Sequence, residues 1–382
     1  MSGVEMAYEM MLWSPTTDIT RPLAYDVSST PESTYKRLEH YVWNTKSRFI
    51  LKEHGDVEVG TRSIPSPGSG EVLVKVNAAA INPVDWKVKG VLSFLLSGYP
   101  AVLGSDGAGV VETVGPDVAG LKKGDRVFFQ GRYIPDWATF QQYALADSQL
   151  LAKIPDNISD DEASTLPVAI LAAGFTLFQK SGIQFPLNGP TATGKPVLIL
   201  GGSSSVGQYT IQLARIAGFS PIVTTASAKH SAHLKGLGAT DVVDRNADAK
   251  TIQAALKGPV SLVVDTISLH ETQSVAFEVL HTQKPVSGAH LALVLPLQED
   301  LKTKNESLGS NSVSANEVLA ISHLDRDTAL PLWHGIGSWI KDGSLVPNRV
   351  QVVPGGLAAV TEALRLSEEG VSGVKLVIHP QE

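Results

Sequence analysis

The chain has 382 residues, enough for two or three domains of ordinary size. Its hydrophobic content of 43% and charged content of 18% are typical of a globular protein with a large core. A net charge of −7 argues against a general nucleic-acid binder, and the lack of cysteine excludes disulfides and thiolate-bound metals. No apolar run approaches the roughly 20 residues that span a bilayer, so we expect no membrane segment. The first residues contain Glu5 and Glu9 and no basic region, which favours a cytoplasmic location over secretion or organelle import.

Residues 1–45 show no clear hydrophobic periodicity and contain several prolines, serines and threonines. This composition predicts a flexible N-terminal extension, with a packed arm or an oligomer contact as the alternative. From residue 46 onward the pattern predicts short strands, separated by glycine and proline: Arg48–Lys52, Asp56–Ser63, Glu71–Ala78, Ala108–Val114, Asp125–Phe129 and Ala144–Lys153. We therefore predict a small β-barrel domain over residues 46–165.

A predicted helix over residues 160–179, with acidic residues in its first turn, links this domain to the next. Strands and helices then alternate, and the predicted strands are Val197–Leu200, Ser220–Thr225, Asp241–Asp244, Ser261–Asp265 and Leu291–Leu295. This alternation predicts a doubly wound parallel sheet over residues 166–342, and hence an α/β fold for the chain.

Two segments depart from that alternation. Residues 299–316 are polar and charged without a period, which predicts a surface insertion or a mobile lobe, with disorder as the alternative. Residues 343–382 return to a β pattern around one helix, and we expect them to complete the β-barrel domain.

The stretch after the first strand of the parallel sheet has the character of a dinucleotide site. Gly202 and Gly207 fill the first and third positions of a G-x-G-x-x-G pattern, and Ser204 fills the second. Small residues let backbone N–H groups approach a pyrophosphate, and the helix that follows supplies partial positive charge at its N-terminus. The alternative is a tight strand-to-helix turn without a ligand.

The end of the next strand indicates which dinucleotide would bind. An NAD site usually has a carboxylate about 20 residues after the glycines, to bind the ribose hydroxyls. Here Ser227 and Lys229 stand instead, and both suit the additional phosphate of NADPH. Arg245 after the third strand could supply a second cation. The alternative is that Lys229 and His230 merely begin a solvated helix.

Several ordered motifs give the chain its resemblance to a known family. Besides the glycine turn, these motifs are Ala80–Lys87, Gly104–Val111, Gly124–Val127, Ala152–Pro155 and Gly238–Asp244. In this order they resemble the medium-chain dehydrogenase/reductase superfamily, over roughly Ser47–Pro380. Within it the chain is most similar to the zinc-independent quinone oxidoreductases and to the fungal trans-acting enoyl reductases that serve polyketide synthases. The resemblance implies a GroES-like catalytic domain, a Rossmann domain and a cleft between them.

The departures from the superfamily concern zinc. Zinc alcohol dehydrogenases place Cys within the segment held here by residues 82–85, and His-Glu where this chain has Ser105 and Asp106. Without a thiolate or histidine at these positions we expect no catalytic metal. Hydride addition to an activated double bond needs none.

The resemblance also implies a set of functional residues. Those expected to line the cofactor are Val84, Asp85, Trp86, Lys87, Ser203, Ser204, Ser205, Val206, Ser227, Ala228, Lys229, His230, Arg245, Val294, Leu295, Val374 and Lys375, beside Gly202 and Gly207. Lys87 is the expected catalytic group near the nicotinamide ribose or substrate carbonyl, with a surface lysine as the alternative. Tyr143 could protonate the enolate, against the alternative of a packed barrel tyrosine.

We therefore expect an NADPH-dependent, zinc-free reductase of an enone or an enoyl thioester, with a polyketide synthase as a potential partner. A quinone reductase of the same fold is one alternative, and a non-catalytic NADPH-binding protein is another. The resemblance allows a monomer or a homodimer.

Overall fold

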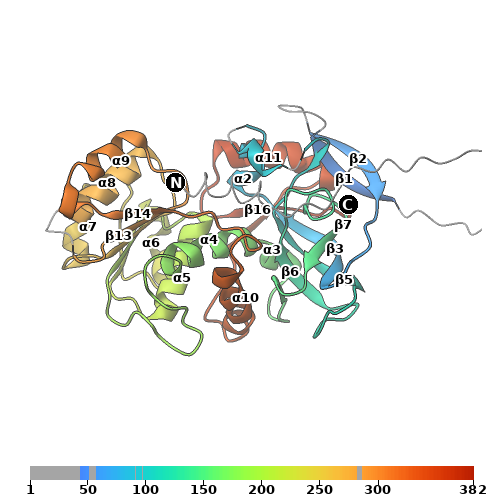
Figure 1. The fold of residues 1–382 in the computed structure, drawn as a ribbon, viewed down its shortest axis with the longest axis horizontal. Helices are drawn as coiled ribbons and strands as arrows, with labels where there is room; N and C mark the ends of the chain where they lie inside the picture. The colour runs from blue at the N-terminus through green and yellow to red at the C-terminus, as the bar shows by residue number, and fades with distance from the viewer. Residues whose placement is uncertain (1–43, 51–56, 91, 97, 282–285) are drawn as a thin grey trace, which may run out of the picture.

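The computed structural model describes residues 44–50, 57–90, 92–96, 98–281 and 286–382. It shows two parts side by side, one built on antiparallel sheets and the other on a parallel sheet, with α10 (Arg326–Lys341) between them (Figure 1). Most of the predicted extension, residues 1–43, lies outside the described residues. Asn44 and Thr45, predicted to end that extension, instead belong to the first strand.

The antiparallel part contains a seven-stranded sheet in the order β15-β16-β3-β5-β6-β8, with β7 paired to β3. Its strands are β3 (Glu71–Ala80), β5 (Asp106–Val114), β6 (Arg126–Gln130), β7 (Tyr143–Asp147), β8 (Leu151–Lys153), β15 (Val350–Val352) and β16 (Lys375–Ile378). A three-stranded sheet consists of β1 (Asn44–Ile50), β2 (Val57–Ser63) and β4 (Ala101–Val102). The single strand predicted over residues 144–153 is therefore two strands, because a turn at residues 148–150 interrupts it.

The C-terminal segment joins this sheet, as its β pattern indicated. β16 runs antiparallel to β3, with Val377 opposite Ala80, and parallel to β15. Between β15 and β16 lies α11 (Val360–Glu369), which packs against α2 (Pro83–Lys87). The C-terminal segment therefore lies next to α2, which follows β3 and contains the first of the predicted functional residues.

The other part is a six-stranded, all-parallel sheet in the order β11-β10-β9-β12-β13-β14. Its strands are β9 (Val197–Leu200), β10 (Ile222–Ala226), β11 (Asp241–Asp244), β12 (Leu262–Asp265), β13 (His290–Leu293) and β14 (Ser314–Glu317). The strand order reverses direction at β9, since β10 lies on one side of it and β12 on the other. In such sheets ligands bind beyond the carboxyl ends of the strands at this reversal.

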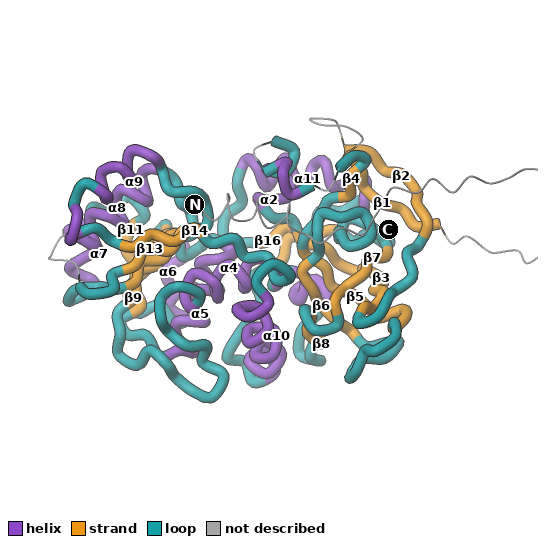
Figure 2. Tube along the Cα trace, viewed as in Figure 1, coloured by secondary structure: helices purple, strands orange, loops and turns teal. Residues whose placement is uncertain are grey.

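Apolar composition explains why the central strands of this sheet form. All four residues of β9 are at most 1% exposed, as expected of a strand covered on both faces. The covering helices are α5 (Ser205–Ala217), α6 (Ser231–Leu237), α7 (Ala249–Leu256), α8 (His270–His281) and α9 (Glu299–Glu306). Figure 2 shows the strands of this part in orange, with purple helices packed around them.

The prediction for residues 299–316 was wrong. This segment holds α9 and leads into β14, the sixth strand of the parallel sheet. Leu301 and Val313 are buried, and the Asn305 amide group binds both the N–H and the C=O of Val313 at 2.9 Å. The composition of this segment gives little apolar signal for a strand. β14 forms nevertheless, because hydrogen bonding to β13 holds it in place.

The predicted helix over residues 160–179 is two helices, α3 (Asp160–Ser164) and α4 (Pro167–Phe178). Pro167 has no N–H and suits the first turn of a helix, so the chain restarts there. α4 is buried on nearly all sides and contacts α5 and α10. One hydrophobic cluster runs from Phe128 of β6 through α4 to the parallel sheet, so the two parts share a core.

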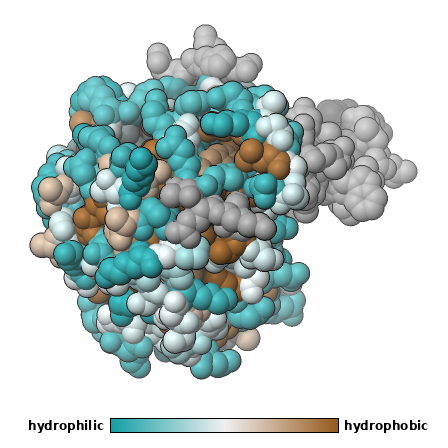
Figure 3. Space-filling view, turned by 90° about the vertical axis from the view of Figure 1, so that its left-hand side faces the viewer, coloured by the Kyte–Doolittle hydropathy of each residue, from teal (hydrophilic) through white to brown (hydrophobic). Residues whose placement is uncertain are grey.

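Figure 3 views the end of the molecule that carries the parallel sheet, and its surface is mostly hydrophilic with small hydrophobic patches. Within the described residues, no helix combines the length and the apolar character needed to cross a bilayer.

Candidate functional site

The glycine turn follows β9 at the reversal point of the parallel sheet. A Cβ on Gly202 would lie 2.1 Å from the Thr224 hydroxyl oxygen, and one on Gly207 would lie 2.3 Å from the Gly201 carbonyl oxygen. The turn is also fastened to β10, because the Gly202 N–H donates to the Thr225 carbonyl at 2.9 Å. Gly202 and Gly207 therefore leave no room for a side chain. Because the backbone packs so closely at the turn, α5 can begin directly after the end of β9.

The serines of the turn have separate roles. Ser204 is the N-cap of α5, and its hydroxyl accepts the Gly207 N–H at 2.9 Å. The Ser205 hydroxyl accepts a hydrogen bond from the Asn348 side-chain amide at 2.9 Å. Ser203 and Val206 are half-buried. A strand end, a turn without side-chain bulk and the N-terminus of a 13-residue helix fit the pyrophosphate of a dinucleotide.

The end of β10 is basic. Ser227 is half-buried, and Ala228 and Lys229 are exposed beyond it. His230 is buried, with its Nε2 2.8 Å from the Ser372 hydroxyl. Arg245 is exposed and follows Asp244, the residue that pairs with Ala226 of β10. The structure therefore places Arg245 directly after β11, the strand that pairs with β10. Its contact with a phosphate stays a prediction.

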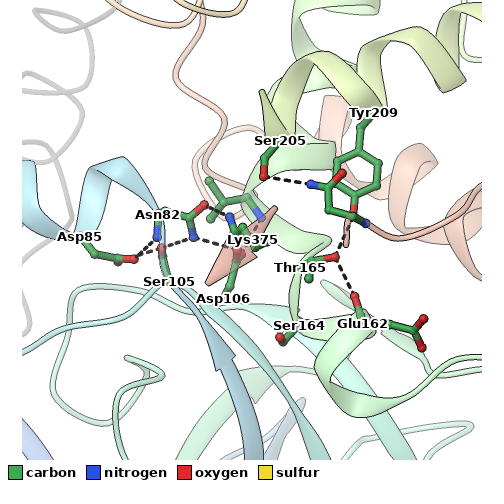
Figure 4. A network of polar contacts seen from close by, with 12 residues as sticks. Asn82, Asp85, Ser105, Asp106, Glu162, Ser164, Thr165, Ser205, Tyr209 and Lys375 are labelled. Atoms are coloured by element: carbon green, nitrogen blue, oxygen red, sulfur yellow. Dashed lines mark hydrogen bonds and ion pairs between the residues drawn. The ribbon is translucent and has the colours of Figure 1, made fainter. Parts of the chain in front are cut away.

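A buried polar network surrounds the start of α2 (Figure 4). The Asp85 carboxylate accepts hydrogen bonds from the Asn82 N–H at 2.7 Å, from Tyr133 at 2.8 Å and from Ser105 at 3.0 Å. Burial raises the pKa of Asp85 to about 7, against the lowering effect of these three donors. The pKa of this buried carboxyl therefore lies well above the range of an exposed aspartate.

The same network contains a buried ion pair between parts of the chain far apart in sequence. The Lys375 amine lies 3.2 Å from the Asp106 carboxylate and also donates to the Asn82 side-chain oxygen. Asp106 further accepts the Val168 N–H, so it fixes the first turn of α4. Burial raises the pKa of Asp106, and the Lys375 charge acts against that rise. The side chains of Asp85 and Lys375 are thus committed to protein partners, and direct contact with a cofactor stays a prediction for both.

Trp86 and Lys87 lie on α2 beside this network. Lys87 is half-buried with its amine 5.3 Å from the centre of the Trp86 ring, and burial lowers the pKa of Lys87. No carboxylate among the described residues forms an ion pair with it. The buried Trp86 indole N–H has no hydrogen-bond partner in the described part of the chain. Both groups are therefore available donors, and Val84 is half-buried next to them.

Tyr143 is not part of this constellation. It pairs with Lys75 on β3, whereas Asp106 pairs with Ala80, which places the two positions about 16 Å apart along the strand. The phenol that the structure brings to the network is Tyr133, which the sequence analysis missed. Its position in an irregular loop after β6 gives no local signal.

The remaining predicted residues lie at the rims of the two sheets. Val294 and Leu295 follow β13 and are half-buried, and the Val294 N–H donates to the Ser268 hydroxyl at 3.0 Å. Val374 immediately precedes β16 and is half-buried.

A second polar network, also in Figure 4, ties the glycine turn to the rest of the chain. Asn348, which sequence analysis also missed, donates through its side chain to Ser205 and through its N–H to the Tyr209 hydroxyl at 3.0 Å. That hydroxyl lies 2.9 Å from Thr165, which in turn donates to the Glu162 carbonyl. The start of α5 is therefore held by residues from before and after the parallel sheet.

Other features bear on the chemistry of the site. The described residues contain no group of three or more His, Asp or Glu side chains placed to hold a metal ion. Surface pockets of about 340 and about 580 Å³ are lined by other elements, around Arg132 with Arg326 and around Trp333 with His334. Neither pocket includes a residue of the glycine turn.

Comparison with known proteins agrees with this architecture. The Alcohol dehydrogenase GroES-like domain family matches residues 68–156, and the Zinc-binding dehydrogenase family matches residues 205–287. The chain is 34% identical over 340 residues to the trans-enoyl reductase tndF of Aspergillus flavipes, which spans 85% of this chain and 95% of that protein. It is 30% identical over 360 residues to lovC of Aspergillus terreus, the enoyl reductase component of lovastatin nonaketide synthase, spanning 87% and 96%.

A solved structure gives the same picture of the fold. The quinone oxidoreductase of Coxiella burnetii superposes with a TM-score of 0.69 at 24% identity, covering 88% of this chain and 99% of that one. Fold and site together define an oxidoreductase in which a GroES-like domain lies beside a Rossmann domain for a nicotinamide dinucleotide. The chain belongs to the medium-chain dehydrogenase/reductase superfamily, among the relatives of the fungal trans-enoyl reductases.

Proposed function

We propose that this protein reduces the activated carbon–carbon double bond of an enone or an enoyl thioester with NADPH. The observation that carries the proposal is the end of β10, where Ser227 and Lys229 replace the carboxylate of an NAD site. A carboxylate there would repel the additional phosphate of NADPH, whereas an ammonium group attracts it. The trans-enoyl reductases among its relatives support the choice of an unsaturated substrate.

In this proposal the glycine turn and the start of α5 hold the pyrophosphate, and Lys229 holds the further phosphate. The bound nicotinamide supplies the hydride. Lys87 donates to the substrate carbonyl oxygen, where negative charge develops as the double bond is reduced. Its half-buried position makes this donor effective, because water around it is restricted.

We further propose that the reaction needs no zinc. Support comes from the residues of this chain at the positions where zinc alcohol dehydrogenases have their zinc-binding side chains. Asn82, Asp85, Ser105 and Asp106 are fully engaged with one another and with Lys375. An amide, a hydroxyl and hydrogen-bonded carboxyls make a poor set of zinc ligands compared with thiolate and imidazole.

A carrier-bound enoyl thioester is the substrate class we favour, with a polyketide synthase as the partner. The relative lovC is the enoyl reductase component of a nonaketide synthase, which supports this choice.

The test is a turnover assay of purified protein with NADPH or NADH against enones, enoyl thioesters and quinones. We expect oxidation of NADPH with the unsaturated carbonyl compounds, a saturated product by mass spectrometry, and no effect of a zinc chelator. Equal rates with NADH would contradict the cofactor assignment, and turnover of quinones alone would contradict the substrate class. Thermal stabilisation by NADPH without any turnover would indicate a non-catalytic binding protein.

A further inference from the structure

We propose that the additional phosphate of NADPH binds between Lys229 and Arg349, and that its binding is coupled to proton uptake by His230 and His233. This inference rests on the proposed NADPH dependence. It adds a residue from the far end of the chain to the phosphate site and gives the cofactor affinity a defined dependence on pH.

Four side chains form what we call the basic cluster: Lys229, His230, His233 and Arg349. They come from η2 (Ala228–His230), from α6 and from the residue before β15. Gly373 allows Arg349 and His230 to approach each other. A Cβ at that position would lie 3.1 Å from both Arg349 Nη2 and His230 Nδ1, and 2.8 Å from His230 Cε1.

Within the part of the chain that the structure describes, the basic cluster has no acidic partner. The charged groups that act on His230 are Lys229 and Arg349, and those that act on His233 are Arg349 and His230. The other polar contacts are neutral, from the Ser372 hydroxyl to His230 at 2.8 Å and from the Gln208 side-chain oxygen to His233 at 3.0 Å. Among the described residues no carboxylate forms an ion pair with Lys229 or Arg349. Four basic groups brought together without a carboxylate are suited to an anionic ligand.

The position of the basic cluster identifies which anion. Lys229 and His230 lie on η2, which begins shortly after β10. The end of β10 is hydrogen-bonded to the glycine turn through Thr225. Gln208, the partner of His233, lies on the first turn of α5. In a Rossmann domain the ribose of the adenosine lies next to the end of the second strand. The additional phosphate of NADPH is attached to that ribose, so it falls within reach of these side chains.

Because of the two histidines, whether protons are taken up or released on phosphate binding can be predicted. Burial and the neighbouring cations lower the pKa of His230, and burial and Arg349 lower the pKa of His233, so both rings are neutral near pH 7 without a ligand. A phosphate dianion stabilises the charged rings and raises both pKa values. Protons are then taken up on binding. A phosphate held by Lys and Arg alone would instead lose its own residual proton, so the sign of the exchange separates the two cases.

The experiment is isothermal titration of the protein with NADPH and with NADH near neutral pH, in two buffers of different ionisation enthalpy. The difference between buffers gives the number of protons exchanged. We expect net uptake with NADPH and none with NADH. Uptake should fall in His233→Gln and His230→Asn, whose folding is checked by thermal unfolding without cofactor.

Arg349→Ala should weaken NADPH on the order of ten- to a hundred-fold and leave NADH nearly unchanged. Lys235→Ala, at an exposed lysine on α6, is the matched control and should change neither affinity. Proton release, no exchange, or an unaltered NADPH affinity in Arg349→Ala would overturn the inference. If the enzyme still reduces enones with NADPH in that case, the proposed function stands. If NADPH does not bind, both are overturned.

Discussion

At the scale of a single residue, we expect Lys229 to determine whether the protein prefers NADPH or NADH. We expect Lys229→Ala to weaken NADPH by roughly 1–3 kcal/mol, the range for a lost charge-assisted hydrogen bond, and to leave NADH nearly unaffected. Because the Lys229 side chain is exposed, its removal should leave the fold intact and affect binding alone. Titration of both cofactors by fluorescence measures it, with Lys235→Ala as the control. Equal losses for NADPH and NADH would place Lys229 outside the phosphate site.

Asp85 is a residue whose burial has a measurable consequence for stability. The folded state raises its pKa from 3.8 to about 7, so folding favours the protonated form. As pH rises from about 4 to about 7 this contribution to the free energy of unfolding is lost, by at most about 1.4 kcal/mol per pH unit. Asp85→Asn removes this titration.

We therefore expect wild type to lose more stability than Asp85→Asn between about pH 4 and about pH 7 in urea unfolding. Asp156→Asn, at an exposed carboxylate, is the control and should follow the wild-type curve. Parallel curves for wild type and Asp85→Asn would show that Asp85 is ionised throughout the range.

At the scale of elements, the strand–turn–helix unit of β9 and α5 depends on close backbone packing. In Gly207→Ala the new Cβ would lie 2.3 Å from the Gly201 carbonyl oxygen, so the start of α5 must move. We expect a loss of about 1–3 kcal/mol in stability from overpacking, and weaker binding of NADPH and NADH alike. Denaturant unfolding and cofactor titration measure the two effects.

Gly236→Ala provides the comparison for that variant. It lies on α6, where nothing is within 4 Å of the added Cβ, and its backbone is not left-handed. Here alanine should stabilise the protein by about 0.5–1 kcal/mol, because glycine is a poor helix former. If both alanine variants behave alike, packing at the glycine turn is not the reason for Gly207.

At the scale of the whole molecule, His379 fastens the C-terminus to the start of α3. Its ring contacts Asp161 and Glu382, each at 2.9 Å. Burial disfavours the charged ring, but the hydrogen bonds to the two carboxylates outweigh it and raise the pKa of His379. The resulting stabilisation is complete below about pH 6.5 and is lost as pH rises through the raised pKa.

We expect His379→Gln to lower the unfolding temperature at about pH 5.5 and to matter less at about pH 8.5, with an effect below about 1 kcal/mol because the pair is partly exposed. His334→Gln, at an exposed histidine of α10, is the control. A deficit that grows with pH would contradict the assigned ion pairs.

Local sequence determined much of this protein. The apolar run of β9, the glycines and serines after it, the left-handed cap at Gly218 and the lack of a carboxylate after β10 follow from neighbouring residues alone. Such features are readable because a strand-to-helix turn and a helix end depend on the steric and hydrogen-bonding properties of a few adjacent residues.

Other features were decided only by tertiary structure. β14 is a strand because β13 pairs with it, and Arg349 reaches His230 because the C-terminal segment returns past Gly373. The hydrogen bond of Tyr133 to Asp85 and the ion pair of Lys375 with Asp106 likewise join residues far apart along the chain. Contacts of this kind leave no periodic trace in the sequence, since their free energy comes from burial and partners that exist only once the sheets have formed.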